Sequence, residues 1–349
     1  MTPKERWLAV LNKQSPDRLP TDYWATTEAH QKLLAHLNCA TDRDLYTRLH
    51  IDRAIAVSPR YRGPTLGKNS DVFGCQHKAV QYGSGTYNEC ISHPLAHYPS
   101  VEAIKTHYIW PNPDWYDYSH LPEQVAQWAD YPIRGGGSEP FLIYKKLRGD
   151  VQAFMDLIEN PDIVHYCLDR LFDLAYTNTQ RIYETLPGKV DLSYVAEDLG
   201  GQESLLFSPQ HIHTFLLPRM KRMIHLAHDA GVFVFFHSDG AIHDIIPTMI
   251  DLGIDVLNPI QWRCQNMDRE TPMKDFGSQL IFHGGVDNQH TLPFGTVDDV
   301  KREVRDNIEI LNQQNRYILA PCHNIQAVSP PENIVAMYET AHELGTSIS

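Results

Sequence analysis

The sequence lacks several features that would assign it to a particular class of protein. No run of apolar residues approaches the roughly 18 residues that cross a membrane. Basic residues are few, since 30 Lys and Arg stand against 43 Asp and Glu and give a net charge of -13. Nucleic acids and anionic membranes are bound through basic patches, so we expect neither as a partner. The segment Met1–Trp7 is charged and no apolar stretch follows it, so we expect no signal peptide.

Paired cysteine motifs are also missing. The six cysteines are scattered and form no Cys-x-x-Cys motif, which predicts a reduced, cytoplasmic protein. Hydrophobic residues make up 42% of the chain and charged residues 21%, a balance typical of a globular protein with a sizeable core. The length of 349 residues suits one large α/β unit, because α/β barrels run from about 200 to more than 400 residues.

Strand and helix patterns alternate along the second half of the chain. Val232–Phe236 is a short apolar run typical of a buried strand, and the preceding helix pattern stops at Gly231. Helix starts are marked by expected cap residues at Ser208, Thr296 and Ser329. Four further strand patterns occur at 189–195, 255–261, 279–282 and 317–320.

Three upstream segments complete a set of eight strands. They lie at 18–24, at 53–58 and near 131–133. Eight strand–helix units predict an α/β fold, a closed (β/α)8 TIM-type barrel in which residues 1–349 form one domain. The segment 61–128 is rich in Pro, Gly, Tyr and His and has no clear periodicity. We expect it to be an insertion over the barrel mouth with aromatic side chains lining an apolar pocket, or alternatively a surface flap or an oligomer contact.

Polar side chains at two predicted strand ends form a candidate metal site. His237 and Asp239 follow the strand at 232–236, and Cys322 and His323 follow the strand at 317–320. Catalytic zinc is commonly held by three protein ligands drawn from His, Asp or Glu, and Cys. The sequence predicts that His237, Asp239 and one of Cys322 or His323 bind a divalent metal. Simpler roles stay open, with Asp239 as a helix cap, His237 as a core histidine and Cys322 as a small buried side chain.

Other strand ends carry candidate catalytic and substrate-binding groups. Glu197 and Asp198 are adjacent acids that could act as a general acid or base, as a further ligand, or only as a solvated or capping pair. His283 stands before two glycines and is a further catalytic candidate, although the glycines could simply make a tight turn. The candidates for binding a polar substrate are Trp24, Asn258, Gln261, Asp287 and Gln289.

Six short motifs, in this order, resemble those of the uroporphyrinogen decarboxylase-like superfamily. They are Pro16–Pro20, Ala196–Gly200, His237–Gly240, Asn258–Gln261, Phe282–Asp287 and Pro330–Ile334. The resemblance covers nearly the whole chain. It implies a (β/α)8 barrel whose active site lies at the carboxyl ends of the strands, in agreement with the strand pattern.

One branch of this superfamily contains the true decarboxylases, which act without metal or cofactor on a tetrapyrrole with many carboxylates. Two arginines in an Arg-Gln-Ala-Gly-Arg segment grip those carboxylates. The corresponding stretch here, 21–28, has no arginine and contains Asp22 and Glu28. Because bidentate arginine pairing is the natural way to bind carboxylates, the resemblance argues against porphyrin decarboxylation.

A second branch contains zinc methyltransferases that work with corrinoid carriers and bear His-x-Cys on the fifth strand end and Cys on the eighth. Here His237 keeps the first position, Asp239 replaces the cysteine, and His323 or, after a one-residue shift, Cys322 takes the third. Such ligands suit zinc and also iron or manganese. The resemblance implies a metal-dependent methyltransferase, with zinc as the first choice of metal.

This enzyme would move a methyl group between a small methylated substrate and a corrinoid, with a corrinoid carrier protein as its partner. Two alternatives remain. The chain could be a metal-independent lyase that decarboxylates a non-porphyrin acid, or a corrinoid- or ligand-binding protein without catalytic activity.

Overall fold

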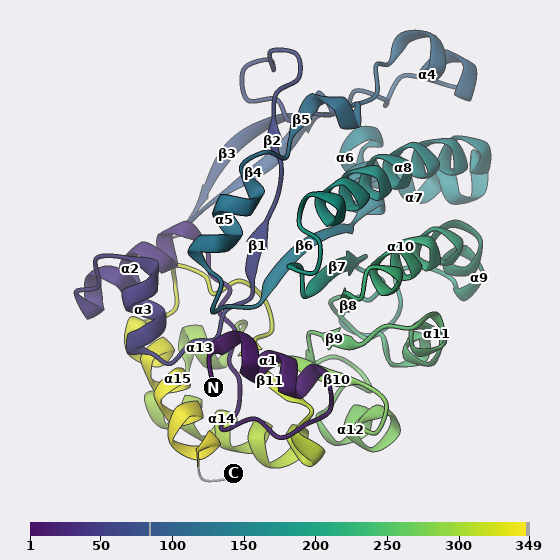
Figure 1. Cartoon of the computed structure of the whole chain (residues 1–349). Helices are drawn as coiled ribbons and strands as arrows, with labels where there is room; N and C mark the ends of the chain where they lie inside the picture. The colour runs from purple at the N-terminus through teal and green to yellow at the C-terminus, as the bar shows by residue number, and fades with distance from the viewer. Residues whose placement is uncertain (84, 347–349) are drawn as a thin grey trace.

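A curled sheet of seven parallel strands forms the centre of the molecule (Figure 1). The computed structural model describes residues 1–83 and 85–346, except for the side chain of Tyr82. The strand order is β1-β6-β7-β8-β9-β10-β11. The strands are β1 (Ile55–Val57), β6 (Ile133–Ser138), β7 (Leu192–Ala196), β8 (Phe233–His237), β9 (Val256–Asn258), β10 (Ile281–Val286) and β11 (Tyr317–Pro321).

Helices connect these strands and cover the outer face of the sheet (Figure 1). Those that follow β6 are α6 (Pro140–Arg148), α7 (Asp150–Glu159), α8 (Pro161–Thr185), α9 (Pro209–His211), α10 (Leu217–Asp229), α11 (Ile246–Leu252), α12 (Glu270–Phe276), α13 (Thr291–Phe294), α14 (Val297–Leu311) and α15 (Pro331–Gly345). Those that precede it are α1 (Pro3–Leu11), α2 (Thr27–Leu37), α3 (Asp42–Arg48), α4 (Val101–His107) and α5 (Leu121–Gln127). In the described part of the chain, no helix has the length and apolar character of a membrane span.

The cap residues behave as expected at two helix starts and differently at a third. Ser208 accepts a hydrogen bond from the amide of His211, and Thr296 forms a capping box with Asp299. The prediction that Ser329 caps the last helix was wrong. Pro330 occupies the cap position of α15, and the hydroxyl of Ser329 is buried without a hydrogen-bond partner in the structure.

An irregular segment takes the place of the eighth strand expected at 18–24. Thr21 forms an isolated parallel bridge with Leu319 of β11, and Ala25 forms another with Ile325. A regular strand does not form here. The Asp22 carboxylate accepts the amides of Tyr23 (2.8 Å) and Ala54 (3.1 Å), and these side-chain contacts interrupt the backbone ladder. Among the described residues, the central sheet therefore has seven regular strands and one bridged segment.

The segment between β1 and β6 packs on the outer helices. It contains β2 (Arg60–Tyr61) paired with β5 (Tyr116–Asp117), and an antiparallel hairpin of β3 (Gln76–Tyr82) and β4 (Gly85–Ser92). Arg148 of α6 donates hydrogen bonds to the carbonyl oxygens of Leu95 (2.5 Å) and Tyr98 (3.0 Å). Trp110 contacts the ring of Tyr166 on α8. These contacts fix the segment on the side of α6 and α8.

A small apolar cluster fills the inner side of the curled sheet. Trp7 of α1 is fully buried there against one inward residue from each of several strands. Those strand residues are Leu192, Phe235, Val256, Ile281 and Ile318. Trp24 and Tyr194 pack on the same cluster and are only partly buried. The cluster is a packed floor, and the polar residues at the carboxyl ends of the strands lie beyond it.

Candidate functional site

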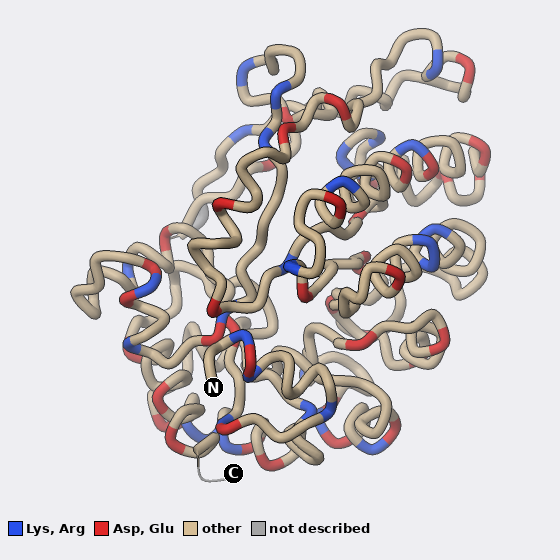
Figure 2. The backbone as a smooth tube through the Cα atoms, viewed as in Figure 1, with Lys and Arg blue, Asp and Glu red and all other residues tan. Residues whose placement is uncertain are grey.

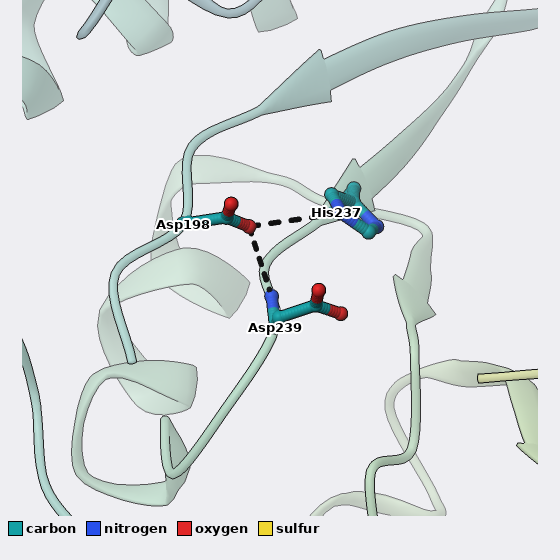
Figure 3. A group of neighbouring side chains, drawn as sticks. All are labelled: Asp198, His237 and Asp239. Atoms are coloured by element: carbon teal, nitrogen blue, oxygen red, sulfur yellow. Dashed lines mark hydrogen bonds and ion pairs between the residues drawn. The ribbon is translucent and has the colours of Figure 1, made fainter. Parts of the chain in front are cut away.

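Asp198, His237 and Asp239 come together at the carboxyl ends of β7 and β8 (Figure 3). One ligand atom from each side chain lies within 4.8 Å of the others. His237 Nε2 is 3.7 Å from Asp198 Oδ1, which also accepts a hydrogen bond from the Asp239 amide at 3.3 Å. His237 is buried, whereas the Asp198 side chain is 38% exposed, so the group is open to solvent on the side of Asp198.

Strand register and close loop packing position this group. Ala196 of β7 pairs with His237 of β8, so both strands end at the same level. The hydroxyl of Ser238 accepts the Leu199 amide at 2.9 Å and ties the two following loops together. Gly240 has φ +94°, and a Cβ there would collide with the backbone of Gly200. Glycine is therefore needed where the loop after β8 passes the loop after β7.

Acidic side chains crowd this end of the sheet. Burial, with the charge of Asp198 next, raises the pKa of Glu139 to about 7; Glu139 directly follows β6. Burial raises the pKa of Asp239, while the charges of His237 and His323 act in the opposite direction. Three neighbouring strand ends thus carry carboxyl groups that repel one another, and a bound cation would relieve this repulsion.

The structure groups Asp198 with His237 and Asp239, and neither Cys322 nor His323 belongs to this three-residue group. The third ligand expected from the sequence, Cys322 or His323, stays a prediction. The thiol of Cys322 donates to the carbonyl oxygen of Ile260 at 3.3 Å, and burial raises its pKa well above the ordinary value. His323 is exposed and lies near enough for its charge to act on Asp239. The proposed capping role of Asp239 does not hold, because the next helical turn has no side-chain cap.

Glu197, predicted to be catalytic, has a structural contact. Its Oε1 accepts the amide of Phe141 at 2.7 Å, and burial raises its pKa well above the ordinary value. The carboxyl group therefore holds the start of α6, in contrast to Asp198, which faces His237.

The predicted substrate-binding residues divide into two groups. Asp287 pairs with Arg263 Nε at 2.6 Å and accepts the amide of Gln289, whose side chain is exposed, so both lie in a turn outside the three-residue group. Gln261 Oε1 accepts the Gly240 amide at 2.8 Å and supports the loop that carries Asp239. Trp24 and Asn258 make direct contacts with His237.

A chain of buried hydrogen bonds runs from His237 into the interior. His237 Nδ1 is 2.6 Å from Asn258 Oδ1, and Asn258 Nδ2 is 2.7 Å from His283 Nδ1. His283 Nε2 is 3.1 Å from Asp22 Oδ2, which also accepts the indole N–H of Trp24 at 2.9 Å. His283 therefore lies behind the site, and Asn258 links it to His237 by hydrogen bonds.

The aromatic wall beside His237 comes from Trp24 and Tyr194, with ring centroids at 6.0 and 5.5 Å. The guanidinium group of Arg134 on β6 lies over both rings, at 5.3 and 5.0 Å. We expected these walls from the segment 61–128. Several of its described rings instead contact each other or α8, as in the pairs Tyr61–Trp115, Tyr108–Trp110 and Trp110–Tyr166. Trp128, at its end, packs on Tyr46 and Tyr131.

Arg134, Glu139 and Tyr194 were absent from the predicted site. Tyr194 belongs to a strand that the sequence did predict, where alternation could have placed it on the inner face. Arg134 precedes the Gly-Gly-Gly run of β6, and Glu139 follows Ser138 at the end of this strand; the glycine run hides the strand pattern beyond the predicted residues near 131–133. The only available signal for Glu139 was its place before Pro140, a residue typical of the first helical position.

Comparisons with known proteins agree on the family and the fold. The family model described as uroporphyrinogen decarboxylase (URO-D) matches residues 126–344. A uroporphyrinogen decarboxylase of Nostoc punctiforme is 25% identical over 224 residues, which cover 63% of this chain and 56% of that protein. One from Legionella pneumophila (strain Paris) is 22% identical over 266 residues, or 73% of this chain and 71% of that protein. The first of these matches spans little more than half the length of the relative.

A solved methyltransferase from Methanosarcina mazei shares the fold over the whole chain. It aligns with a TM-score of 0.69 and 21% sequence identity, covering 99% of each chain. At this level of identity the likeness shows a common fold.

Proposed function

The chain belongs to the uroporphyrinogen decarboxylase family, and we propose that it is a metal-dependent methyltransferase of this family. It would move a methyl group between a small methylated substrate and a corrinoid carrier, delivered by a carrier protein. The observation that carries this proposal is the group of Asp198, His237 and Asp239 at the strand ends. Decarboxylation of a porphyrin with many carboxylates is disfavoured, because the segment 21–28 has no arginine to bind them.

The donor atoms of this group fit a divalent metal. They are one imidazole nitrogen and carboxylate oxygens from two side chains, within 4.8 Å of one another. This donor set suits zinc, iron or manganese, and zinc with three protein ligands leaves a position for substrate. A divalent metal held there would supply Lewis acidity toward the atom that carries or receives the methyl group.

The surrounding side chains have defined tasks in such a transfer. Trp24 and Tyr194 shield one side of His237 from water with their rings. Glu139, with a pKa of about 7, can give a proton to the atom that loses a methyl group, or remove one from the atom that gains it. Arg134 places a positive charge beside the aromatic wall, and this charge helps to lower the pKa of Asp22.

A metal-independent carboxy-lyase is the second candidate. Its support is that the sequence relatives, at 22 to 25% identity, are named uroporphyrinogen decarboxylases. A lyase of this kind would use Arg134 to hold a carboxylate and Glu139 to supply the proton that replaces carbon dioxide. The two candidates differ in whether the group of Asp198, His237 and Asp239 binds a metal.

Metal analysis of purified protein separates the two candidates. We expect one divalent metal per chain in protein prepared without added metal, and tight rebinding of zinc after chelation. His237→Ala should remain folded and lose most of the bound metal, because metal affinity depends on each ligand. His243→Ala is a matched control, since His243 also faces a carboxylate, Asp275 at 2.9 Å, outside the site. Full metal occupancy in His237→Ala would falsify the metal site and favour the lyase.

A spectroscopic measurement addresses the methyl transfer itself. Cobalamin changes its visible absorption when a methyl group binds to or leaves its cobalt. We expect such a change when the zinc-loaded protein is mixed with reduced cobalamin and a methylated alcohol, amine or thiol. His237→Ala should give no change above that of a protein-free mixture, while His243→Ala should behave as the wild type.

A further inference from the structure

The hydrogen bonds behind His237 have a direction that their chemistry determines. The Asp22 carboxyl group is fully buried and accepts four hydrogen bonds, from Trp24 Nε1, His283 Nε2 and the amides of Tyr23 and Ala54. Burial opposes its ionisation, but these donors, His283 foremost, hold its pKa below the ordinary value. Asp22 is therefore a carboxylate and only accepts, so the Nε2 of His283 carries a hydrogen.

His283 is neutral in this setting. It is completely buried, and the rings of Trp7, Trp24 and Phe235 lie within 5.9 Å of its own. Burial lowers its pKa, although the hydrogen bond to Asp22 acts in the opposite direction. Because a neutral imidazole carries one hydrogen, the Nδ1 of His283 is an acceptor.

The side-chain amide of Asn258 links His283 to His237 and sets which ring nitrogen of His237 is the donor. Its Nδ2 donates to His283 Nδ1 at 2.7 Å, which turns its Oδ1 toward His237 Nδ1 at 2.6 Å. An amide oxygen only accepts, so the Nδ1 of His237 carries the hydrogen. In the neutral imidazole, the other ring nitrogen, Nε2, then has its lone pair on the side of Asp198, 3.7 Å away.

We propose that Asp22, His283 and Asn258 form a positioning relay that fixes His237 in the tautomer with its hydrogen on Nδ1 and its Nε2 lone pair directed into the site. Ligating histidines commonly donate their second N–H to a polar partner, which orients the ring and makes the ligand more basic. The relay extends this arrangement over two further buried residues. Its hydrogen-bond order stands on the structure alone, whereas its effect on metal binding rests on the proposed function.

Nuclear magnetic resonance can read the tautomer directly in metal-free protein. We expect the ring-nitrogen spectrum of chelator-treated, 15N-labelled protein near neutral pH to show His237 with hydrogen on Nδ1 and His283 with hydrogen on Nε2. Spectra of His237→Gln and His283→Gln assign the signals. Hydrogen on Nε2 of His237, or a doubly protonated His283, would overturn the relay even if the protein binds metal.

Two variants then test whether the relay acts on His237. Asn258→Leu removes both links and Asp22→Asn removes the terminal charge, and we expect each to mix the His237 tautomers and weaken zinc binding about 10- to 100-fold. Tyr338→Phe is the matched control, because Tyr338 donates to the backbone oxygen of Asp22 at 2.8 Å and leaves its carboxylate untouched. It should preserve both the tautomer and the affinity.

The outcomes separate the relay from the proposed function. An unchanged His237 tautomer in folded Asn258→Leu would refute the relay. If Asn258→Leu does not fold, the wild-type spectrum and Asp22→Asn decide the question. A wild-type protein that shows the expected tautomer but binds no zinc would refute the metal site and leave the relay intact.

Discussion

Single residues at the ends of β6, β7 and β8 show how the same chemical group takes different roles in different surroundings. Glu197 is buried, and its Oε1 accepts a hydrogen bond from the amide of Phe141, so it supports α6. Its sequence neighbour Asp198 is partly exposed and faces His237 Nε2. Glu139 makes no side-chain cap at the start of α6. Proximity along the sequence therefore does not decide which acid serves the site; the direction of each side chain does.

Glu139 provides a pH-dependent prediction at this scale. Its pKa of about 7 in the folded protein is raised chiefly by burial, so the folded state holds the proton more tightly than the unfolded chain does. The stability that this proton confers is complete below the ordinary glutamate pKa and is lost as pH rises through about 7. In metal-free protein, we expect the wild type to lose about 1–3 kcal/mol more unfolding free energy than Glu139→Gln between about pH 5 and pH 8.

Urea denaturation at the two pH values measures this difference. Glu203→Gln is the matched control, because Glu203 is exposed and the substitution should leave the pH dependence unchanged. Parallel pH curves for the wild type and Glu139→Gln would show that Glu139 ionises freely in the folded protein.

At the scale of elements, the sequence predicts what depends on local pattern. The strand β7 was predicted from its alternation of apolar and polar residues, and β8 to β11 were predicted as short strands followed by polar residues. The same reasoning placed His237 and Asp239 at a strand end, and the structure confirms that location. The segment 18–24 was wrongly predicted as a regular strand. The carboxylate of Asp22 accepts hydrogen bonds from backbone amides there, and no local sequence pattern reveals these contacts.

The third member of the site could not be chosen from the sequence. Asp198, Cys322 and His323 all follow strands, and only the register of β7 against β8 brings Asp198 to His237. Cys322 turns instead to the carbonyl oxygen of Ile260, a contact between residues 62 positions apart. Contacts of this range depend on packing, which a single sequence does not specify.

The C-terminal helix α15 carries a second pH-dependent prediction. His342 stacks on His50 with ring centroids 3.6 Å apart and planes 9° from parallel. The pKa values of both are lowered, chiefly by burial. The charge of Arg18 acts in the same direction on both, and Glu343 opposes the shift of His342. The unfolded chain therefore binds protons first, and the stability contributed by the pair is lost as pH falls through the ordinary histidine range.

We expect acid to weaken the docking of α15, and His342→Gln to reduce this effect. Thermal unfolding at about pH 7.5 and pH 5.5 measures the loss, and hydrogen exchange over α15 locates it. His225→Gln on α10 is the control, since His225 is an exposed histidine on another helix. If His342→Gln and the wild type lose equal thermal stability in acid, the stacked pair of histidines does not cause the loss.

The whole chain shares its fold with one solved structure and has sequence similarity to other proteins. It aligns over 99% of its length with a methyltransferase structure, while the family model covers residues 126–344. Acidic and basic positions are interspersed along the outer helices (Figure 2). Acids instead concentrate at the site, where Glu139, Asp198 and Asp239 influence one another. We therefore expect the local charge near the site, more than the net charge of -13, to constrain the choice of substrate.

We expect this local charge to disfavour a substrate with many carboxylates. Arg134 lies beside the site, but no arginine occurs in the segment 21–28, where the resemblance to the decarboxylases would place two. The Asp22 carboxylate of that segment already accepts hydrogen bonds from His283 and Trp24.

We therefore expect no decarboxylation of uroporphyrinogen at an enzymatic rate, which would be roughly 1 per second or more. Chromatography of the oxidised porphyrin products measures this, with the Nostoc punctiforme relative as a positive control. Product formed at such a rate would mean that Arg134 and other cations can hold the carboxylates, and the lyase would replace the methyltransferase as the better account of this site.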